Sequence, residues 1–330
     1  MTIKDLAKIA KVSQTAVSLA LNNKPGVSDK TRKQIIELAD KYGYNKKGIN
    51  RKRIIFIKYM NNGLAVEKNG DFIAKLIDSM EKAASNLGYD LTIKNTLSVN
   101  FFQEIKGIDF SYYDGAIFLG TEADEKDIKA FKNINIPIVA VDNMFENKYI
   151  DSVVMNNWGG IKQAINFLTS LGHKNIGYID STVHFSNFDQ RFKAYVYESE
   201  RLKLERKYIL KVTPNMEDAY IDTLNYLKKY SDKLPTAFIA ANDTIAIGAI
   251  KAFKEYKLKI PDDISIIGFD DIPFCSILDK PLATIKVFKE KMGETAIKLL
   301  DERINNPSEE KIKVLSMTKL VKRESVTILK

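Results

Sequence analysis

The sequence predicts two kinds of structure in one chain: an all-α helix-turn-helix headpiece, and an α/β core of two doubly wound parallel-sheet subdomains. Three observations support this prediction. Short amphipathic stretches fill the first 45 residues, apolar runs then alternate with longer amphipathic stretches, and the excess positive charge is confined to the first 53 residues. Alternation of this kind is typical of parallel sheets covered by helices.

The second stretch of the headpiece, VSQTAVSLALN at 12–22, sorts its residues onto two faces. Ser13 is a favourable N-cap for a helix from Gln14 to Asn22. At about 100° per residue, one face is formed by Val17, Ala20 and Leu21. The opposite face carries short polar side chains and one leucine: Thr15, Ser18, Leu19 and Asn22. Such a face suits either a solvated surface helix or a helix that enters the major groove of DNA.

The flanking stretches favour the DNA-binding interpretation. TIKDLAKIA at 2–10 predicts a first helix with a capping box of Thr2 and Asp5, and only three residues separate it from the second helix. NNKPG at 22–26 predicts a turn, and Ser28 is placed to cap a third helix that ends near Tyr42. Three such helices would bury one small core and leave the second helix exposed.

The charge distribution indicates a polyanionic partner for this segment. Residues 1–53 hold 13 basic and 4 acidic residues, a net charge of +9 that equals the net charge of the whole chain. The remaining residues therefore carry as many acids as bases. A role in solubility would not need this segregation, whereas binding to double-stranded DNA would.

The remainder of the chain is too long for one ordinary core and suits two subdomains. Its predicted strands are RIIFI, YDLTI, DGAIFL, IPIVAV, NIGYI, YILKV, TAFIA and ISIIGF, and the predicted helices between them are 72–87, 124–132, 188–203, 217–229 and 243–256. We expect the first four strands in one subdomain and the others in the second. The one cysteine, Cys275, is expected to be half-buried. It fits a reducing, cytoplasmic compartment, and no apolar run is long enough to cross a membrane.

Ligands of doubly wound sheets bind beyond the carboxyl ends of the strands. The residues that follow the predicted strands are rich in carboxylates and amides: Thr121, Asp142, Asn143, Asp180, Asn242, Asp243, Asp270 and Asp271. A ring of such groups suits a ligand with many hydroxyls, because each acid or amide can bind two of them. The sequence has no nucleophile elbow, dinucleotide fingerprint or P-loop, and no His/Cys spacing for a metal. It therefore predicts neither an enzyme nor a cofactor.

The sequence resembles the LacI/GalR family of bacterial transcription regulators. The resemblance is carried by residues 2–44 and continues with NNWGGIKQAINFLTSLGHKNIGYI (156–179), ANDTIAIGAIKAF (241–253), ISIIGFDD (264–271) and PLATIKVFKEKMG (281–293). It implies a homodimer with a ligand-sensing core built like a type I periplasmic binding protein. The implied segments are a headpiece (1–45), a basic hinge (46–53), an N-terminal core subdomain (54–155 with about 287–318) and a C-terminal one (156–286 with about 319–330).

For the headpiece, the family motif implies that Gln14, Thr15 and Leu19 face bases. It places four residues near phosphates: Ser13, Ser18, Asn22 and Thr31. Phosphate contacts position the protein on DNA, whereas base contacts specify the sequence.

The hinge departs from the family pattern. Family members usually form a short helix here on DNA, and its leucine wedges between base steps of the minor groove. In NKKGINRKR at 45–53, Arg53 stands where that leucine is expected, and Gly48 weakens a helix by about 1 kcal/mol relative to alanine. Two interpretations stay open: a flexible basic linker, or a hinge in which Arg51 or Arg53 reads a narrow minor groove electrostatically.

For the cleft, the predicted effector-binding residues are Phe72, Asp142, Asn157, Trp158, Phe185, Arg191, Asn242 and Asp270. Arg191 matches the pocket arginine of the family and would fork onto paired hydroxyls or a carboxylate. The three aromatic residues would stack on the apolar face of a sugar ring. Structural alternatives stay open, with Asp142 and Asp243 as caps, Phe72 as core and Trp158 as packing. His173 is expected to be structural, and His184 lies close enough in sequence to Arg191 to reach the pocket.

The leading hypothesis is a repressor of carbohydrate-use genes, whose affinity for operator DNA changes when a small sugar-like effector binds between the subdomains. A purine effector is disfavoured, because Phe185 stands where purine-binding relatives carry a second arginine. The alternative is a regulator of the same family that is controlled by a phosphoprotein corepressor.

Overall fold

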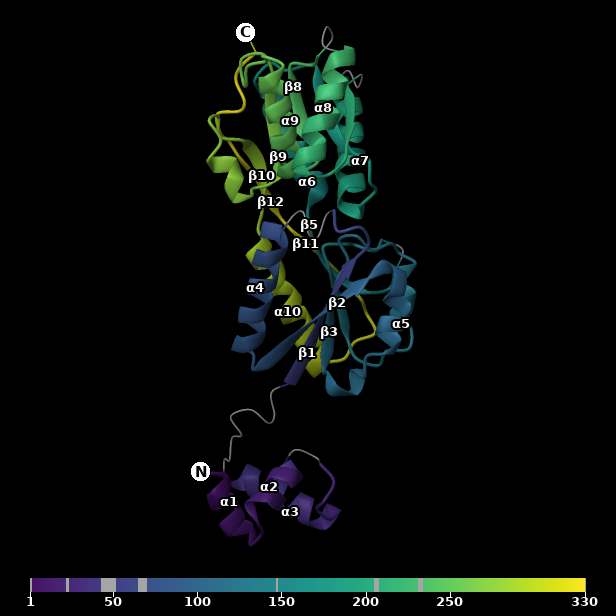
Figure 1. The fold of residues 1–330 in the computed structure, drawn as a ribbon, viewed down its shortest axis with the longest axis vertical. Helices are drawn as coiled ribbons and strands as arrows, with labels where there is room; N and C mark the ends of the chain where they lie inside the picture. Colours follow the sequence, from purple (N-terminus) through teal and green to yellow (C-terminus); the bar gives the residue numbers. More distant parts are fainter. Residues whose placement is uncertain are drawn as a thin grey trace. The chain divides into compact units, whose positions relative to one another are not determined.

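The computed structural model describes residues 2–21, 24–42, 52–64, 70–146, 148–204, 208–230 and 234–329. The chain forms two compact units, Met1–Lys52 and Arg53–Lys330 (Figure 1). Asn22, Arg51 and most of the predicted hinge lie outside the described residues, so their roles stay predictions. Each unit is considered by itself below.

The first unit is the predicted three-helix headpiece, made of α1 (Ile3–Ala10), α2 (Gln14–Leu21) and α3 (Asp29–Lys41). Thr2 and Asp5 form the predicted capping box at the start of α1. The Ser13 hydroxyl accepts a hydrogen bond from the N–H of Ala16 at 3.0 Å and so caps α2, as the sequence predicts. The three helices share one small core: Leu6, Ala7, Ala10, Val17, Ala20, Ile35 and Ala39.

The N-terminal part of the core is a six-stranded sheet in the order β11-β5-β4-β3-β1-β2. The strands are β1 (Lys52–Met60), β2 (Tyr89–Leu97), β3 (Gly115–Leu119), β4 (Ile138–Val141), β5 (Asp151–Met155) and β11 (Lys313–Ser316). The helices are α4 (Gly70–Asn86), α5 (Phe101–Lys106) and α10 (Lys289–Asn305), with 3₁₀ turns at Ser98–Asn100, Phe110–Tyr112 and Asp127–Phe131. The last of these turns replaces the longer helix predicted at 124–132.

Both faces of this sheet are covered, which explains the unbroken apolar run in β1 (Figure 1). Ile54 and Phe56 point to the face covered by α4 and α10. Ile55, Ile57 and Tyr59 point to the other face, where they pack in a cluster with aromatic residues of α5 and the 3₁₀ turns. Successive strand residues alternate between faces, so the segment 54–57, which is buried on both sides, is apolar at every position.

The C-terminal part is a second six-stranded sheet in the order β12-β10-β9-β8-β6-β7. The strands are β6 (Ile176–Ser181), β7 (Ile209–Val212), β8 (Ala237–Ala240), β9 (Ser265–Asp270), β10 (Ala283–Val287) and β12 (Thr318–Val321). The helices are α6 (Asn157–Ser170), α7 (Ser186–Arg201), α8 (Met216–Tyr230) and α9 (Asp243–Glu255), and a 3₁₀ turn covers Pro273–Ser276. The edge strand β12 runs antiparallel to β10, whereas the other recorded pairs are parallel.

The chain passes between the two sheets three times, and each passage is a single residue long. Asn156 joins β5 to α6, Phe288 joins β10 to α10, and Met317 joins β11 to β12. Three short connections of this kind form a hinge, because small dihedral changes at each of them rotate one subdomain against the other. The eight predicted strands are all present, whereas β5, β10, β11 and β12 were not among them.

A buried ion pair fixes the returning strand β11 to the first sheet. Arg303 of α10 donates two hydrogen bonds to the Asp151 carboxylate, at 3.0 and 3.1 Å. Asp151, at the start of β5, also accepts from the N–H of Ile312 at 2.9 Å. The Lys313 ammonium donates to four carbonyl oxygens between residues 144 and 150, at 2.7 to 3.2 Å. Lys313 of β11 thereby holds the loop between β4 and β5, and the Asp151 contacts hold the end of that loop.

The helices α4 and α10 cross at close range because of Gly293. A β-carbon at this position would overlap the hydroxyl of Ser79 and approach the carbonyl oxygen of Leu76 to 2.8 Å. Any larger residue would push the two helices apart. The glycine therefore sets the distance at which α10 packs on the N-terminal sheet.

Candidate functional site

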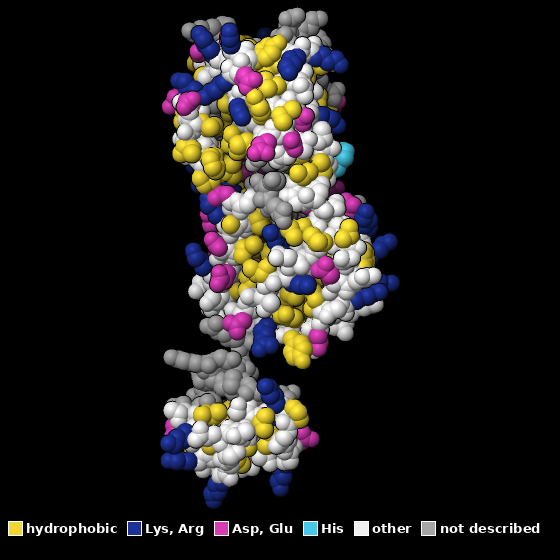
Figure 2. Space-filling view, viewed as in Figure 1, with side chains coloured by type: hydrophobic (Ala, Val, Ile, Leu, Met, Phe, Trp, Pro, Cys, Tyr) yellow, Lys and Arg dark blue, Asp and Glu magenta, His cyan; other side chains and the backbone are white. Residues whose placement is uncertain are grey.

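The exposed face of α2 carries the residues predicted to contact DNA. Ser13, Gln14 and Thr15 are exposed, and Ser18, Leu19 and Thr31 are half-buried. Leu19 packs at the turn after the helix, since a β-carbon on Gly26 would lie 3.1 Å from its Cδ1. Lysine and arginine side chains stand out from the headpiece surface (Figure 2). The arrangement offers short polar groups, one apolar tip and positive charge, as binding to a DNA groove requires.

Arg32, which the sequence analysis did not single out, fixes the end of α2. Its guanidinium donates to the carbonyl oxygens of Leu19 and Ala20 at 3.3 and 3.2 Å, and to that of Lys24 at 2.7 Å. The last carbonyls of a helix have no partner within the helix, so a cation from α3 satisfies them and complements the helix dipole. Arg32 thus orients the helix that would read DNA.

The structure corrects the placement of Arg53. From the sequence, Arg53 is predicted to lie in the hinge, at the position of the family's wedging leucine. Instead Arg53 lies in β1, where its N–H donates to the Asp114 carboxylate at 2.7 Å and its carbonyl accepts from the Asp114 N–H at 2.8 Å. β1 starts at Lys52, one residue before the predicted strand RIIFI, and so includes Arg53, which the hinge assignment had placed in the linker. The Arg53 backbone is consequently part of the core sheet and not of a linker.

In the core, six of the eight predicted effector-binding residues meet between the two sheets. They surround a cavity of about 20 Å³, which has room for roughly one water molecule. Its lining comes from both subdomains: Phe72, Thr121, Asp142, Met155, Phe185, Asn187, Phe188, Arg191, Asn242 and Asp270. Thr121, Asp142, Asn242 and Asp270 all lie at or just beyond the carboxyl ends of strands, where ligands of such sheets bind.

Arg191 of α7 is the centre of this site and is only 2% exposed. Its Nε donates to the side-chain oxygen of Asn157 at 2.8 Å, and its Nη1 donates to the carbonyl of Ala241 at 2.6 Å. Its Nη2 lies 3.5 Å from the Asp270 carboxylate. The guanidinium also lies flat against the ring of Phe269, 3.7 Å from the ring centre. These contacts fix its plane, so that its remaining donors can face a ligand in only one orientation.

Asp142 follows β4 and faces Arg191 from the other subdomain. Its carboxylate accepts from the Thr121 hydroxyl at 2.6 Å and from the side-chain amide of Asn187 at 2.9 Å. The same Asn187 amide also binds the Asp142 carbonyl oxygen at 2.9 Å. Complete burial raises the pKa of Asp142 to about 6, because the Thr121 hydroxyl and the Arg191 charge offset only part of the cost of desolvation.

Asn187 is the residue that the sequence analysis missed. Its amide group joins α7 of the C-terminal subdomain to Asp142 of the N-terminal one, and its side-chain oxygen accepts from Asn157 at 2.9 Å. Asn187 precedes Arg191 by four residues, so the two side chains lie on the same face of α7. Because Arg191 was predicted to face the cleft, this spacing could have identified Asn187 as a second cleft residue.

Other predicted residues fall outside the cavity lining. Asn157 lies behind it and binds Arg191 and Asn187. Trp158 does not line the cavity, contrary to the prediction: the residue is 43% exposed, and its ring packs edge-on against Tyr197, with ring centres 5.7 Å apart. It is the second residue of α6, where the helix directs it to the surface beside α7.

The remaining polar residues have structural partners. Asp243, which is fully buried, accepts from the Thr284 hydroxyl at 2.5 Å and the Ile272 N–H at 3.0 Å. Its side chain also lies against Cys275, which is fully buried and not half-buried as expected. His173 bridges Thr236 and the Thr327 carbonyl, as the structural expectation had it, and the exposed His184 pairs with Asp189.

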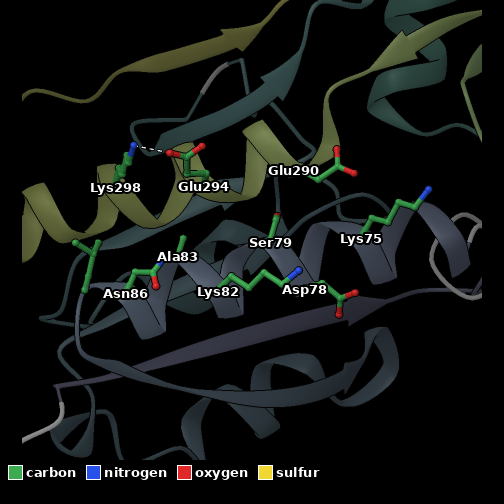
Figure 3. A pocket seen from close by; sticks show the side chains of 10 residues that line it. Lys75, Asp78, Ser79, Lys82, Ala83, Asn86, Glu290, Glu294 and Lys298 are labelled. Carbon is green, nitrogen blue, oxygen red and sulfur yellow. Dashed lines mark hydrogen bonds and ion pairs between the residues drawn. The ribbon is translucent and has the colours of Figure 1, made fainter.

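Of the further hollows in the described part of the chain, two are large or adjoin the cavity. One, of about 280 Å³, adjoins it at Phe185 and is lined by residues of both subdomains. The other, of about 550 Å³, is a surface groove between α4 and α10 (Figure 3). Its lining is mainly charged, and Lys298 of α10 is bonded to Glu294 of the same helix. No group of three potential metal ligands is found in the described part of the chain.

Membrane insertion of a helix finds no support in the described residues, since none of their helices is both long and apolar enough to cross a bilayer.

Comparisons with known proteins agree with this architecture. The profile of bacterial regulatory proteins of the lacI family matches residues 2–46, and that of the periplasmic binding protein-like domain matches residues 165–326. The probable HTH-type transcriptional repressor ExuR of Bacillus subtilis is 30% identical, over 99% of this chain and 98% of the relative. The ribose operon repressor of Haemophilus influenzae is 28% identical, over 100% of this chain and 99% of the relative.

Solved structures share the fold over nearly the whole chain. The lac repressor dimer bound to operator and the anti-inducer ONPF aligns with a TM-score of 0.78 at 22% identity, over 99% of both chains. A LacI family regulator from Enterococcus faecium with bound ribose aligns with a TM-score of 0.72 at 23% identity, over 84% of this chain and 100% of that one. The curated relatives are transcriptional repressors and not enzymes. The chain therefore belongs to the LacI family of bacterial regulatory proteins.

Proposed function

We propose that the protein is a repressor of carbohydrate-use genes, and that a small sugar-like effector bound between the core subdomains controls its affinity for operator DNA. The observation that carries the proposal is the convergence of Arg191, Asp142, Asn242 and Asp270 around one cavity between the sheets. These groups suit a ligand with many hydroxyls, because each carboxylate or amide can bind two of them.

In this proposal the headpiece reads double-stranded operator DNA. Gln14, Thr15 and Leu19 contact base edges, and Ser13, Ser18, Asn22 and Thr31 contact phosphates. Arg51 adds a contact to the minor groove. The protein acts as a cytoplasmic homodimer, so that two headpieces meet two half-sites. The half-buried position of Leu19 supports a contact with one defined base, because its side chain packs against the turn at Gly26.

The effector acts through the three connections between the two core subdomains. Asp142 and Asn187 touch across the two subdomains, so a ligand that binds between them changes how the sheets face each other. Rotation about the three single-residue connections then alters the spacing of the two headpieces. Coupling of this type changes operator affinity by ~1–3 kcal/mol, which is about 5- to 150-fold.

The test begins with selection of bound sequences from random duplex DNA at fixed, near-physiological salt, because affinity for DNA depends steeply on salt. We expect a two-fold symmetric site. Operator affinity is then measured with and without neutral sugars. Arg191→Lys, which loses the planar fork, is expected to abolish the response, whereas the matched change Arg201→Lys on the exposed part of α7 is expected to keep it.

A response that survives Arg191→Lys unchanged would refute the proposed effector site. If no sugar changes operator affinity and a phosphorylated protein does, the corepressor alternative replaces the proposal.

A further inference from the structure

The charged residues in the lining of the cavity are two carboxylates, Asp142 and Asp270, and one cation, Arg191. Asp142 and Asp270 are both 3% exposed or less. Among the described lining residues Arg191 is the only cation, and it already contacts Asp270 at 3.5 Å. Once this pair is counted, the carboxylate of Asp142 remains, and its partners Thr121 and Asn187 are neutral donors. A ligand of this site therefore has to donate hydrogen bonds to an acid.

The hollow that adjoins the cavity has the same character. It shares Phe185 with the cavity, and its lining includes five carboxylates: Glu122, Asp124, Glu125, Glu146 and Asp189. Against these acids the described lining offers Lys193 and His184. Lys126 and Lys148 pair with two of the acids, at 3.1 and 3.9 Å. Acids outnumber bases in this lining, and an excess of negative charge disfavours the approach of an anionic ligand.

Lys289 is a buried cation beside Phe72, one of the residues that line the cavity. It is 3% exposed, and its ammonium lies 5.6 Å from the centre of the Phe72 ring. It donates to the backbone carbonyl of Asp271 at 3.4 Å and does not line the cavity. Of these two residues, Phe72 and not Lys289 is therefore the one that a ligand in the cavity meets.

We propose, on the basis of the effector role inferred above, that the cleft is selective for an uncharged polyhydroxylated sugar and rejects sugars that carry a carboxylate or a phosphate. Adjacent hydroxyls of the sugar donate to Asp142, and the fixed donors of Arg191 bind its ring oxygens. An anionic sugar would place a second negative charge beside Asp142 in a buried site, where like charges strongly disfavour each other.

The first experiment is calorimetric titration of the full chain at pH 7.5 with matched pairs of probes. The neutral probes are D-ribose, D-galactose, D-glucose and cellobiose, and the anionic ones are ribose 5-phosphate, D-galacturonate and D-glucuronate. We expect binding by at least one neutral sugar, and affinity at least about tenfold lower for its anionic counterpart. Tighter binding of a sugar acid or phosphate that Arg191→Lys removes would overturn the selectivity but leave the sugar-effector function intact. Binding of no probe would overturn both.

The second experiment changes the charge of the cleft without changing its shape. Asp142→Asn keeps an acceptor oxygen but loses the negative charge. We expect this variant to bind the neutral sugar about tenfold more weakly or worse. We also expect the difference in affinity between the neutral sugar and its anionic counterpart to shrink or reverse, because the buried negative charge is gone. Asp218→Asn is the matched control, because Asp218 is exposed on α8 and bonds only Asn215 in the recorded contacts. If Asp142→Asn is folded, as thermal melting would show, and the difference in affinity between neutral and anionic sugars is unchanged, Asp142 does not determine the selectivity.

Discussion

The buried pair of Asp151 and Arg303 gives a prediction whose size follows from its contacts. In Arg303→Met the guanidinium is lost while most of the side-chain volume remains. The Asp151 side chain is 1% exposed, so its carboxylate would stay buried without its bidentate partner. Removal of one partner from a buried ion pair typically costs ~3–5 kcal/mol.

The value for this protein is expected at the lower end of that range. Asp151 keeps the Ile312 N–H at 2.9 Å and has Lys311 at 3.6 Å, and both stabilise its charge. We therefore expect the free energy of unfolding of the core to fall by about 3 kcal/mol. Urea unfolding followed by circular dichroism measures this change, with a separate check that the core unfolds in a single step.

A double-mutant cycle tests the reasoning. Asp151→Asn in the Arg303→Met background removes the unpaired charge, so the double variant should be more stable than Arg303→Met alone. A loss below about 1 kcal/mol in Arg303→Met, or strictly additive losses in the double variant, would refute the claim that the pair is buried and coupled.

Three further predictions concern other parts of the chain. Burial raises the pKa of Asp243 from 3.8 to about 7, so the folded state binds more protons than the unfolded one between these values and stability falls as pH rises from about 4 to about 7. Asp243→Asn should flatten this dependence in unfolding curves at pH 5 and 8, and an unchanged slope would contradict the assignment. Arg32→Met should destabilise the headpiece by ~2 kcal/mol and weaken operator binding, as melting and fluorescence anisotropy would report; equal stability would show that the three carbonyl contacts are dispensable. Leu19→Arg should redirect base preference toward guanine by ~1–3 kcal/mol in selection from random DNA, and an unaltered site would mean that α2 is oriented differently.

The sequence predicted those parts of the fold that depend on local pattern. Ser13 caps α2 as expected, because an N-cap needs only a hydroxyl and the three following residues. The eight predicted strands are also present, because a short apolar run is a local signal for a buried strand. Asp142, Arg191 and Asp270 meet in one cavity because strand ends of a doubly wound sheet gather at one edge.

The features that were missed depend on contacts between distant residues. β5 begins with Asp151, which reads as a polar interruption until Arg303 is known to neutralise it from α10. Trp158 was assigned to the cleft because it stands at the start of a helix. The direction of its ring, however, depends on how α6 is rotated about its axis. The sequence around Trp158 does not determine that rotation, because it is set by packing against distant elements. Arg53 was assigned to the hinge because nothing local shows that Asp114 would bind its backbone.

The position of Trp158 has a practical consequence. It is the sole tryptophan of the chain, it directly follows Asn157, and its indole ring is partly open to solvent beside Tyr197. Asn157 holds both Arg191 and Asn187, so a rearrangement of the cleft shifts the backbone that carries the indole. Emission from this one ring should therefore change in wavelength and in quenching when the subdomains move. The protein carries its own optical reporter of occupancy at the hinge, without any attached label.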